Sequence, residues 1–314
     1  MNRLRILVSL VMQNNAYQRQ QAVAAKHAAR QLGVDAEILF ADNDALTQGR
    51  QLLSVIRSSH SRPDGIICFP VGTTLVQVAH CAAEAGIAWA VLNRDCDCTS
   101  ELRSKHSVPI FSVSVDQAEI GRLQGRQIAA LLPEGGLTLY ILGPSASPIV
   151  AYRQSLMQAS KPATVQVRTL WGDWSEQSAY RAVTSWLRLS TSMSAPLKLV
   201  AAQCDDMAIG ARRAFEDHPD KQERKRWTSL PDIGCDGCPD AGQEWVRRNL
   251  LSATVVSPPT AGIALEMMTQ ALRGKTQPSE LKRVVPSSFP AIVKIAETAR
   301  TMNRSHAANP RVGR

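Results

Sequence analysis

The sequence predicts an α/β protein of two similar lobes, each built on a doubly wound parallel sheet. Three observations predict it. The chain has 314 residues, more than one ordinary domain needs. Short apolar segments alternate with longer segments of helical periodicity, which is typical of parallel strands joined by helical crossovers. The same series of segments occurs twice, so we expect two lobes of one design.

The first series begins with the apolar segment 6–12. Polar Gln13, Asn14 and Asn15 follow at once and there is no small-residue cleavage site, so we interpret the segment as a buried strand rather than a signal peptide. The further elements expected in this half are helix 17–32, strand 36–40, helix 46–58, strand 65–69, helix 73–85 and strand 89–92.

The second series restarts near Val115. Its expected elements are helix 117–131, strand 137–142, helix 149–159, strand 165–170, helix 176–189, strand 198–202, helix 206–217, a basic loop at 221–226 and strand 232–235. Strand 251–256, helix 261–273 and strand 282–285 are too few for a third domain. We therefore expect them to cross back between the lobes and form a multi-strand hinge beside a ligand cleft.

The crossings predict the lobe boundaries. The N-terminal lobe is expected to comprise residues 1–114 plus 258–285, and the C-terminal lobe residues 115–257 plus 286–295. Residues 296–314 are expected to form a basic tail, helical at first and then disordered.

Composition excludes several classes of protein. No stretch approaches the roughly 20 apolar residues of a membrane span. The net charge of +9 is assigned to a solvated loop and the terminus, because no nucleic-acid recognition motif accompanies it. Seven cysteines, an odd number in a long chain, favour reduced thiols over a disulfide scaffold. The pairs Cys96/Cys98 and Cys235/Cys238 do not make a convincing zinc site, so neither a metal nor a cofactor is expected.

Acidic residues end two of the predicted strands, at 202–206 and 233–236. The carboxyl edge of a parallel sheet is where open α/β folds bind ligands. Catalytic motifs such as a phosphate loop, a metalloprotease helix or a nucleophile elbow are absent, and none of the six histidines falls at a strand edge. We therefore expect a binding protein and not an enzyme.

Residues 4–295 resemble the type I periplasmic sugar-binding proteins, the ribose-binding branch of the solute receptors of ABC transporters. The same fold forms the effector domain of LacI-type repressors. The resemblance lies in Asn-Asn-Ala-Tyr (14–17), Leu-Asn-Arg-Asp (92–95), Val-Ser-Val-Asp (113–116) with Gly121 and Gly125, Ala-Gln-Cys-Asp-Asp-Met-Ala-Ile-Gly (202–210), Gly-Cys-Asp-Gly-Cys-Pro-Asp (234–240) and Ser-Ala-Thr-Val (252–255). The last three, in this order and spacing, are specific.

The resemblance implies a ligand site made by both lobes. It assigns the two ring-stacking aromatics to Tyr17 and Trp174, the two arginines to Arg94 and Arg153, and the acid of the C-terminal lobe to Asp236. At four further positions the chain departs from the family's polar or charged residues, having Phe69, Asn93, Cys204 and Ser257.

Six of these residues have a plainer alternative. Asp236 could cap a turn, Arg153 could be a surface arginine and Arg94 could join the lobes by a salt bridge. The others could be core residues: Tyr17 as a half-buried aromatic, Phe69 in the lobe core, and Cys204 as a buried thiol. Asp205 is expected to cap the helix that begins at 206.

The function that the resemblance implies is non-catalytic binding of a small carbohydrate or sugar-like ligand, with hinge closure, by a periplasmic receptor of an ABC-type uptake system. The expected partners are the ligand and an ABC permease or membrane sensor, with no nucleic acid and a monomeric chain. The alternative is a cytoplasmic ligand-sensing domain without a DNA-binding module, which the missing signal peptide, free thiols and positive charge favour. Because acids are fewer than in the family, sugar acids, sugar phosphates or deoxy sugars are expected to bind in preference to ribose.

Overall fold

The computed structural model describes residues 3–59, 62–73, 75–94, 98–193 and 195–307, without the side chains of residues 193 and 302–307. The chain forms two compact α/β units. Unit 1 lies within Met1–Gln117 and Pro258–Val285, and unit 2 within Ala118–Ser257 and Pro286–Arg314. In this division the chain first passes to unit 2 after Gln117.

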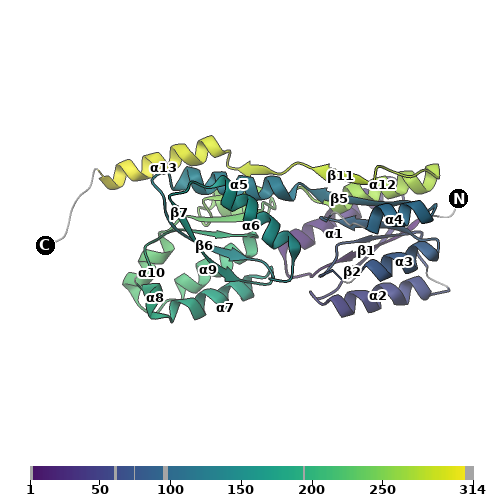
Figure 1. Cartoon of the computed structure of the whole chain (residues 1–314), viewed down its shortest axis with the longest axis horizontal. Helices are drawn as coiled ribbons and strands as arrows, with labels where there is room; N and C mark the ends of the chain where they lie inside the picture. The colour runs from purple at the N-terminus through teal and green to yellow at the C-terminus, as the bar shows by residue number, and fades with distance from the viewer. Residues whose placement is uncertain (1–2, 60–61, 74, 95–97, 194, 308–314) are drawn as a thin grey trace. The chain divides into compact units, whose positions relative to one another are not determined.

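Unit 1 is a parallel sheet in the order β11-β5-β4-β3-β1-β2 (Figure 1). Its strands are β1 (Arg5–Leu10), β2 (Asp35–Phe40), β3 (Gly65–Cys68), β4 (Ala88–Leu92), β5 (Ile110–Val115) and β11 (Leu281–Val284). Its helices are α1 (Ala16–Leu32), α2 (Ala45–Arg57), α3 (Val76–Glu84), α4 (Cys98–Lys105) and α12 (Thr260–Gly274).

The side-chain alternation of β1 shows why the sheet of unit 1 is covered on both faces. Ile6 and Val8 pack with the buried residues of α1 and α12, whereas Leu7 packs with those of α2 and α3. Successive strand side chains point to opposite faces, so a continuous apolar strand needs helices on both sides. This is the doubly wound arrangement that the sequence predicts.

Unit 2 repeats the design in the order β12-β10-β9-β8-β6-β7, with β12 antiparallel to β10. Its strands are β6 (Gly136–Leu142), β7 (Val165–Trp171), β8 (Leu197–Ala202), β9 (Asp232–Asp236), β10 (Ala253–Val256) and β12 (Ser287–Phe289). Its helices are α5 (Gln117–Leu131), α6 (Pro148–Ser160), α7 (Glu176–Leu187), α8 (Ser190–Met193), α9 (Asp205–Glu216), α10 (Lys221–Thr228), α11 (Gly242–Arg247) and α13 (Ile292–Ala307).

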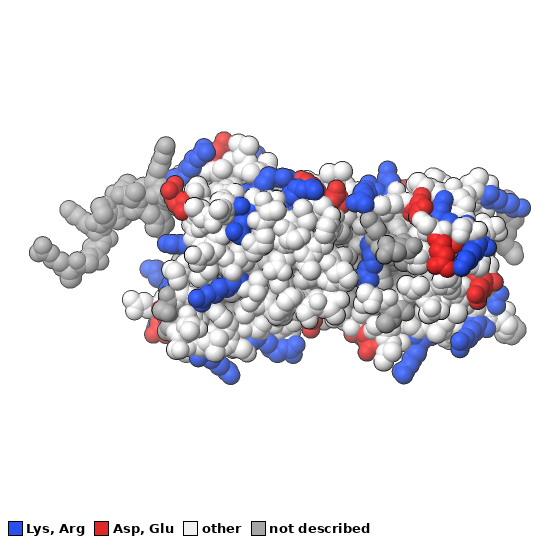
Figure 2. All heavy atoms as spheres, in the orientation of Figure 1, with Lys and Arg blue, Asp and Glu red and all other residues white. Residues whose placement is uncertain are grey.

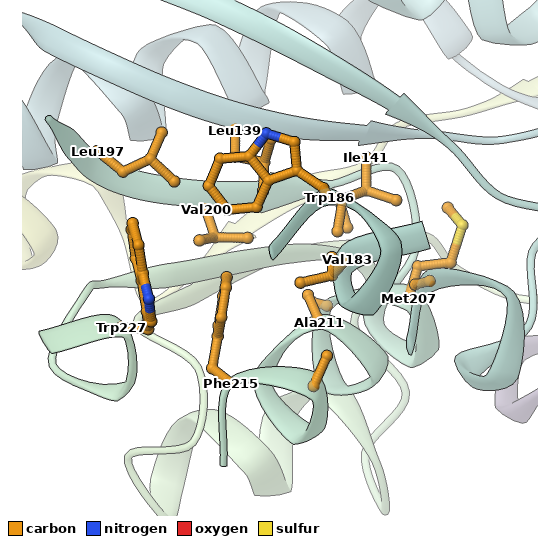
Figure 3. Packing of buried hydrophobic residues seen from close by; sticks show 14 of the residues in the cluster. Leu139, Ile141, Val183, Trp186, Leu197, Val200, Met207, Ala211, Phe215 and Trp227 are labelled. Atoms are coloured by element: carbon orange, nitrogen blue, oxygen red, sulfur yellow. The ribbon is translucent and has the colours of Figure 1, made fainter. Parts of the chain in front are cut away.

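An aromatic cluster fills the core of unit 2 on the face covered by α7 and α9. The ring of Trp227 stacks on Phe215 at 5.7 Å between ring centroids and meets the edge of Trp186 at the same distance. Figure 3 shows these rings against Leu139 and Val200 of the sheet. Through the Trp227 side chain, this cluster attaches α10 to the rest of unit 2.

The prediction of a basic loop at 221–226 is wrong, because those residues lie in α10. Asp220 begins the helix, its Oδ1 accepting the backbone N–H groups of Gln222 and Glu223 at 2.7 and 2.9 Å. The sequence analysis also missed α4, β5, α8, α11 and β12. In the predicted basic tail, residues 296–307 lie in α13, and the disorder expected after them falls outside the described residues.

The expectation of reduced thiols is wrong for Cys98, which is disulfide-bonded. Cys68, Cys81, Cys204, Cys235 and Cys238 are free.

Lys and Arg side chains are scattered over the face drawn in Figure 2, with Asp and Glu between them, and do not gather in one patch. Within the described part of the chain, no helix combines the length and apolar character of a membrane span.

Candidate functional site

The predicted site residues of unit 1 follow the carboxyl ends of β1, β3 and β4. Tyr17 lies in the first turn of α1, which starts after Asn15, whose side chain accepts the Gln18 N–H at 3.1 Å. Phe69 directly follows β3 and Asn93 directly follows β4. Because parallel strands end at one edge, these side chains come together although they are far apart in sequence.

Asn93 and Tyr17 form a hydrogen-bonded pair. The Asn93 Nδ2 donates to the Tyr17 hydroxyl at 2.9 Å, and that hydroxyl donates to the Pro258 carbonyl at 3.3 Å. The Asn93 Oδ1 accepts the Thr260 hydroxyl at 3.2 Å. Both side chains are buried, and the Phe69 ring meets the Tyr17 ring edge-on at 6.4 Å. Asn93 therefore fixes Tyr17 in place within unit 1.

Arg94 lies next to this pair and is half-buried. Its Nη1 donates to the Gly72 carbonyl, and within the described residues it forms no ion pair. Burial lowers the pKa of Arg94, and the neighbouring Cys68 thiol opposes that shift. Unit 1 thus presents a partly desolvated guanidinium without a carboxylate partner among the described residues.

In unit 2, Arg153 and Trp174 form the corresponding pair. The Arg153 Cζ lies 6.0 Å from the Trp174 ring centroid, and its Nη1 donates to the Gln203 carbonyl at 3.3 Å. Arg153 is only 7% exposed, which rules out the surface-arginine alternative. The Trp174 ring lies against Gly143, where an added Cβ would come within 2.3 Å of it. The glycine therefore makes room for the indole.

Gln203 holds the neighbouring loops, and the sequence analysis missed this role. Its Oε1 accepts the Gly143 N–H at 3.2 Å and its Nε2 donates to the Val150 carbonyl at 3.0 Å. It thereby joins the ends of β6 and β8 to the helix that contains Arg153. In the sequence, the signal for this role was the position of Gln203 at the end of a predicted strand, directly before Cys204.

The thiol of Cys204 is buried and donates to the Trp174 carbonyl at 3.6 Å. Cys204, and not Asp205, is the residue before α9. Asp205 instead accepts the Gly237 N–H and the Thr254 hydroxyl, each at 2.7 Å. The prediction that Asp205 caps the helix is therefore wrong, because its side chain faces away from its own helix start toward β9 and β10.

Asp236 ends β9 and is 8% exposed. Burial raises its pKa well above the ordinary value, the nearby Asp205 carboxylate adds to that shift, and Arg153 opposes it. Ser257, also buried, donates its backbone N–H to the Asp236 carbonyl at 2.9 Å. Unit 2 therefore brings an arginine, an aromatic ring and an acid to one sheet edge.

Backbone strain marks three of the predicted site residues. Asn93, Trp174 and Asp236 have φ values of 54°, 74° and 111°. A φ in this region costs most for Trp174, since Asn and Asp adopt it more readily, and strained residues of this kind often cluster at ligand sites. Asp42, Asn43, Asn249 and Lys275, outside the predicted site, also have positive φ. A sequence pattern does not reveal this strain.

The edge of each unit offers a guanidinium group and an aromatic ring, and that of unit 2 also offers a carboxyl group. Such groups suit the hydroxyls and C–H faces of a small polar ring. Among the described residues, no three His, Cys, Asp or Glu side chains are grouped so as to bind a metal ion. The predicted site residues thus fall into two sets, Tyr17, Phe69, Asn93 and Arg94 in unit 1, and Arg153, Trp174, Cys204, Asp236 and Ser257 in unit 2.

Comparisons with known proteins agree with this architecture. The family model described as periplasmic binding protein domain matches residues 6–276. A solute-binding protein of an ABC transporter from Actinobacillus succinogenes 130z, with bound D-allose, is 19% identical with a TM-score of 0.78, over 95% of this chain and 100% of that one.

Two other solved structures are similarly close. The periplasmic binding protein of the arabinose ABC transporter from Shewanella sp. ANA-3, bound to L-arabinofuranose, is 20% identical with a TM-score of 0.76, covering 98% of this chain and 100% of that one. The fructose-binding periplasmic domain of a hybrid two-component system is 20% identical with a TM-score of 0.74, covering 97% of each chain.

Proposed function

Because the chain belongs to the periplasmic binding protein domain family, we propose that it binds a small carbohydrate or carbohydrate derivative as the solute receptor of an ABC-type uptake system. The family is a ligand-binding family and not an enzymatic one. The similar structures with bound D-allose and L-arabinofuranose support a sugar-like ligand. We place the protein outside the cytoplasm and expect an ABC permease as its partner.

The observation that most supports the proposal is the edge of unit 2. Arg153 is buried between the Trp174 ring and the Gln203 carbonyl, and its charge acts on Asp236. Burying a guanidinium beside a carboxyl group is costly unless their hydrogen-bonding capacity is used. Vicinal hydroxyls of a sugar suit such a pair, because they can accept from the guanidinium and donate to the carboxyl group.

Unit 1 would add a positive charge to the ligand's surroundings. Arg94 has no ion pair among the described residues, and the adjacent Asn93 is neutral and already bonded to Tyr17 and Thr260. A carboxylate or phosphate on the ligand would pair with this guanidinium. We therefore propose that sugar acids or sugar phosphates bind more tightly than neutral sugars.

Two other residues disfavour a ligand with hydroxyls on every carbon. Phe69 offers no hydrogen bond, and the Cys204 thiol is a weak donor already directed at the Trp174 carbonyl. A buried hydroxyl left without a partner costs about 1–3 kcal/mol. Deoxy sugars would avoid this cost, so ribose is expected to bind weakly.

Titration calorimetry with ribose, glucose, galacturonate and a ribose phosphate tests the proposal. We expect an anionic compound to bind at least about tenfold more tightly than ribose, the equivalent of about 1.4 kcal/mol. Arg94→Gln should remove most of that preference, and Arg153→Ala should abolish binding. The matched control is Arg168→Gln, since Arg168 is exposed on β7 and should leave affinity unchanged. Tight ribose binding without any response to the anions would contradict the ligand class.

A sensory role is the second candidate, favoured by the similarity to a fructose-binding domain of a two-component system. Uptake of the labelled ligand by cells that lack the gene separates the two roles. Loss of uptake supports the transport receptor. Unchanged uptake together with a lost transcriptional response to the ligand supports the sensor.

A further inference from the structure

The carboxylate of Asp205 joins three elements of unit 2. It lies at the first residue of α9 and is 2% exposed. Its Oδ2 accepts the Gly237 N–H, in the loop after β9, and its Oδ1 accepts the Thr254 hydroxyl on β10. Both distances are 2.7 Å, so each carboxylate oxygen has a well-placed donor.

Gly234 and Gly242 leave room for the Asp205 carboxylate, because neither has a side chain. A Cβ on Gly234 would lie 2.1 Å from Oδ1, and a Cβ on Gly242 would lie 1.9 Å from Oδ2. Any other residue at either position would displace the Asp205 side chain. The surrounding backbone is therefore shaped around the carboxylate.

The carboxylate also lies among groups that disfavour its charge. The acidic side chains of Asp206 and Asp236 lie nearby, and within the described residues Asp205 forms no ion pair. Burial raises the pKa of Asp205 to about 8, against the effect of its two hydrogen bonds. A buried acid without a cation is costly to a fold, so its presence needs a reason other than stability.

The Asp236–Gly237 peptide supplies that reason. Its N–H is held by Asp205, and its carbonyl is held by the backbone N–H of Ser257 at 2.9 Å. Asp236 itself has the strained φ of 111°. Fixing the peptide plane at both ends holds the Asp236 backbone in a conformation that it would not keep alone.

We infer that Asp205 is a positioning residue for ligand binding: its Oδ2 holds the Gly237 N–H and thereby directs the Asp236 side chain. This inference rests on the proposed function in that Asp236 is taken to contact the ligand. The hydrogen bonds of the Asp205 side chain can be tested separately from its ability to ionise. Asn can keep both contacts, because its oxygen can accept the Gly237 N–H while its amide donates to the Thr254 hydroxyl.

Three variants separate positioning from general packing. Asp205→Ala removes the acceptor for Gly237. Asp205→Asn keeps that acceptor and cannot ionise. Thr254→Val is the matched control, because it removes only the buried hydrogen bond to Oδ1. Asp205→Leu replaces Asp205→Ala if the latter does not fold, since it fills the space without an acceptor.

Amide hydrogen exchange at Gly237 tests the positioning without any ligand. We expect exchange at least about tenfold faster in Asp205→Ala, and within about threefold of the wild type in Asp205→Asn and Thr254→Val. Unchanged exchange in Asp205→Ala, or an equal rise in Thr254→Val, would overturn the inference.

Calorimetry with galacturonate and a ribose phosphate tests the consequence for binding. We expect Asp205→Ala to lose at least about tenfold in affinity while Asp205→Asn and Thr254→Val stay within about threefold. Faster exchange with unchanged affinity would overturn the role in binding. A wild type that binds no carbohydrate would instead overturn the proposed function, and the exchange result would still decide the positioning.

Discussion

At Asp232 burial and an ion pair act in opposite directions on one carboxyl group. Its Oδ2 lies 3.3 Å from the Arg212 Nη1, while its Oδ1 has no hydrogen-bond partner among the described residues. Burial raises the pKa of Asp232 to about 7, and Arg212 only partly offsets this shift. The ion pair with Arg212 does not compensate for the hydration that both carboxyl oxygens of Asp232 lose on burial.

This raised pKa predicts how stability depends on pH. The unfolded chain releases the Asp232 proton near pH 3.8, the folded protein near pH 7. Between these values the folded state holds an extra proton on Asp232, so this group makes the free energy of unfolding fall as pH rises, by at most about 1.4 kcal/mol per pH unit. The raised pKa values of Asp205 and Asp236 act in the same direction. Asp232→Asn should flatten this fall between about pH 4 and 7, measured by urea denaturation.

The control for that experiment is Asp35→Asn, at the exposed start of β2 as Asp232 is at the buried start of β9. It should follow the wild-type profile. A wild-type free energy of unfolding that rises across this interval, with the same rise in Asp232→Asn, would contradict the assignment.

Single residues also show where sequence reasoning ends. The acids at the strand ends were visible in the sequence, because an apolar run that stops at Asp is a local pattern. The direction of the Asp205 side chain was not, since it depends on two glycines and a threonine from other elements. The site residues brought together within each unit remain predictions as ligand contacts.

At the scale of elements, α10 shows how tertiary contacts overrule a local pattern. Its many charges predict a solvated loop, yet Trp227 is fully buried and anchors it. The apolar faces of α1 and α9 repeat regularly and were predictable. A single tryptophan among basic residues produces no hydrophobic periodicity, so the sequence gives no sign of an amphipathic helix there.

That anchor predicts a large loss of stability for Trp227→Ala. The substitution removes a ring that stacks on Phe215 and lies under the Arg226 guanidinium at 4.2 Å. We expect the free energy of unfolding to fall by about 3–5 kcal/mol, as for other buried tryptophans. Chemical denaturation followed by far-UV circular dichroism measures it.

Trp171→Ala is the matched control, because Trp171 is 51% exposed on the edge strand β7. Its effect should stay within about 0.5 kcal/mol. Similar losses in both variants would mean that α10 does not depend on the Trp227 ring.

At the scale of the whole molecule, the duplicated series of strands and helices made the fold class predictable. Each unit is a sheet covered on both faces, and each brings its predicted site residues to one edge. The short strand β11 was predicted at 282–285. The three-residue strand β12 was missed, because it is completed by pairing with β10 and is too short to show a pattern of its own.

The chain passes between the units after Gln117, Ser257 and Val285. A ligand closes such a protein only if it binds the closed state more tightly than the open one. We predict that the anionic sugar selected by calorimetry reduces the radius of gyration measured by small-angle X-ray scattering. Arg153→Ala should show no reduction at the same ligand concentration, because it lacks the proposed ligand contact in unit 2. Saturating ligand that leaves the wild-type scattering curve unchanged would show that binding does not require closure, and the predicted hinge would then have no role in the signal to a permease.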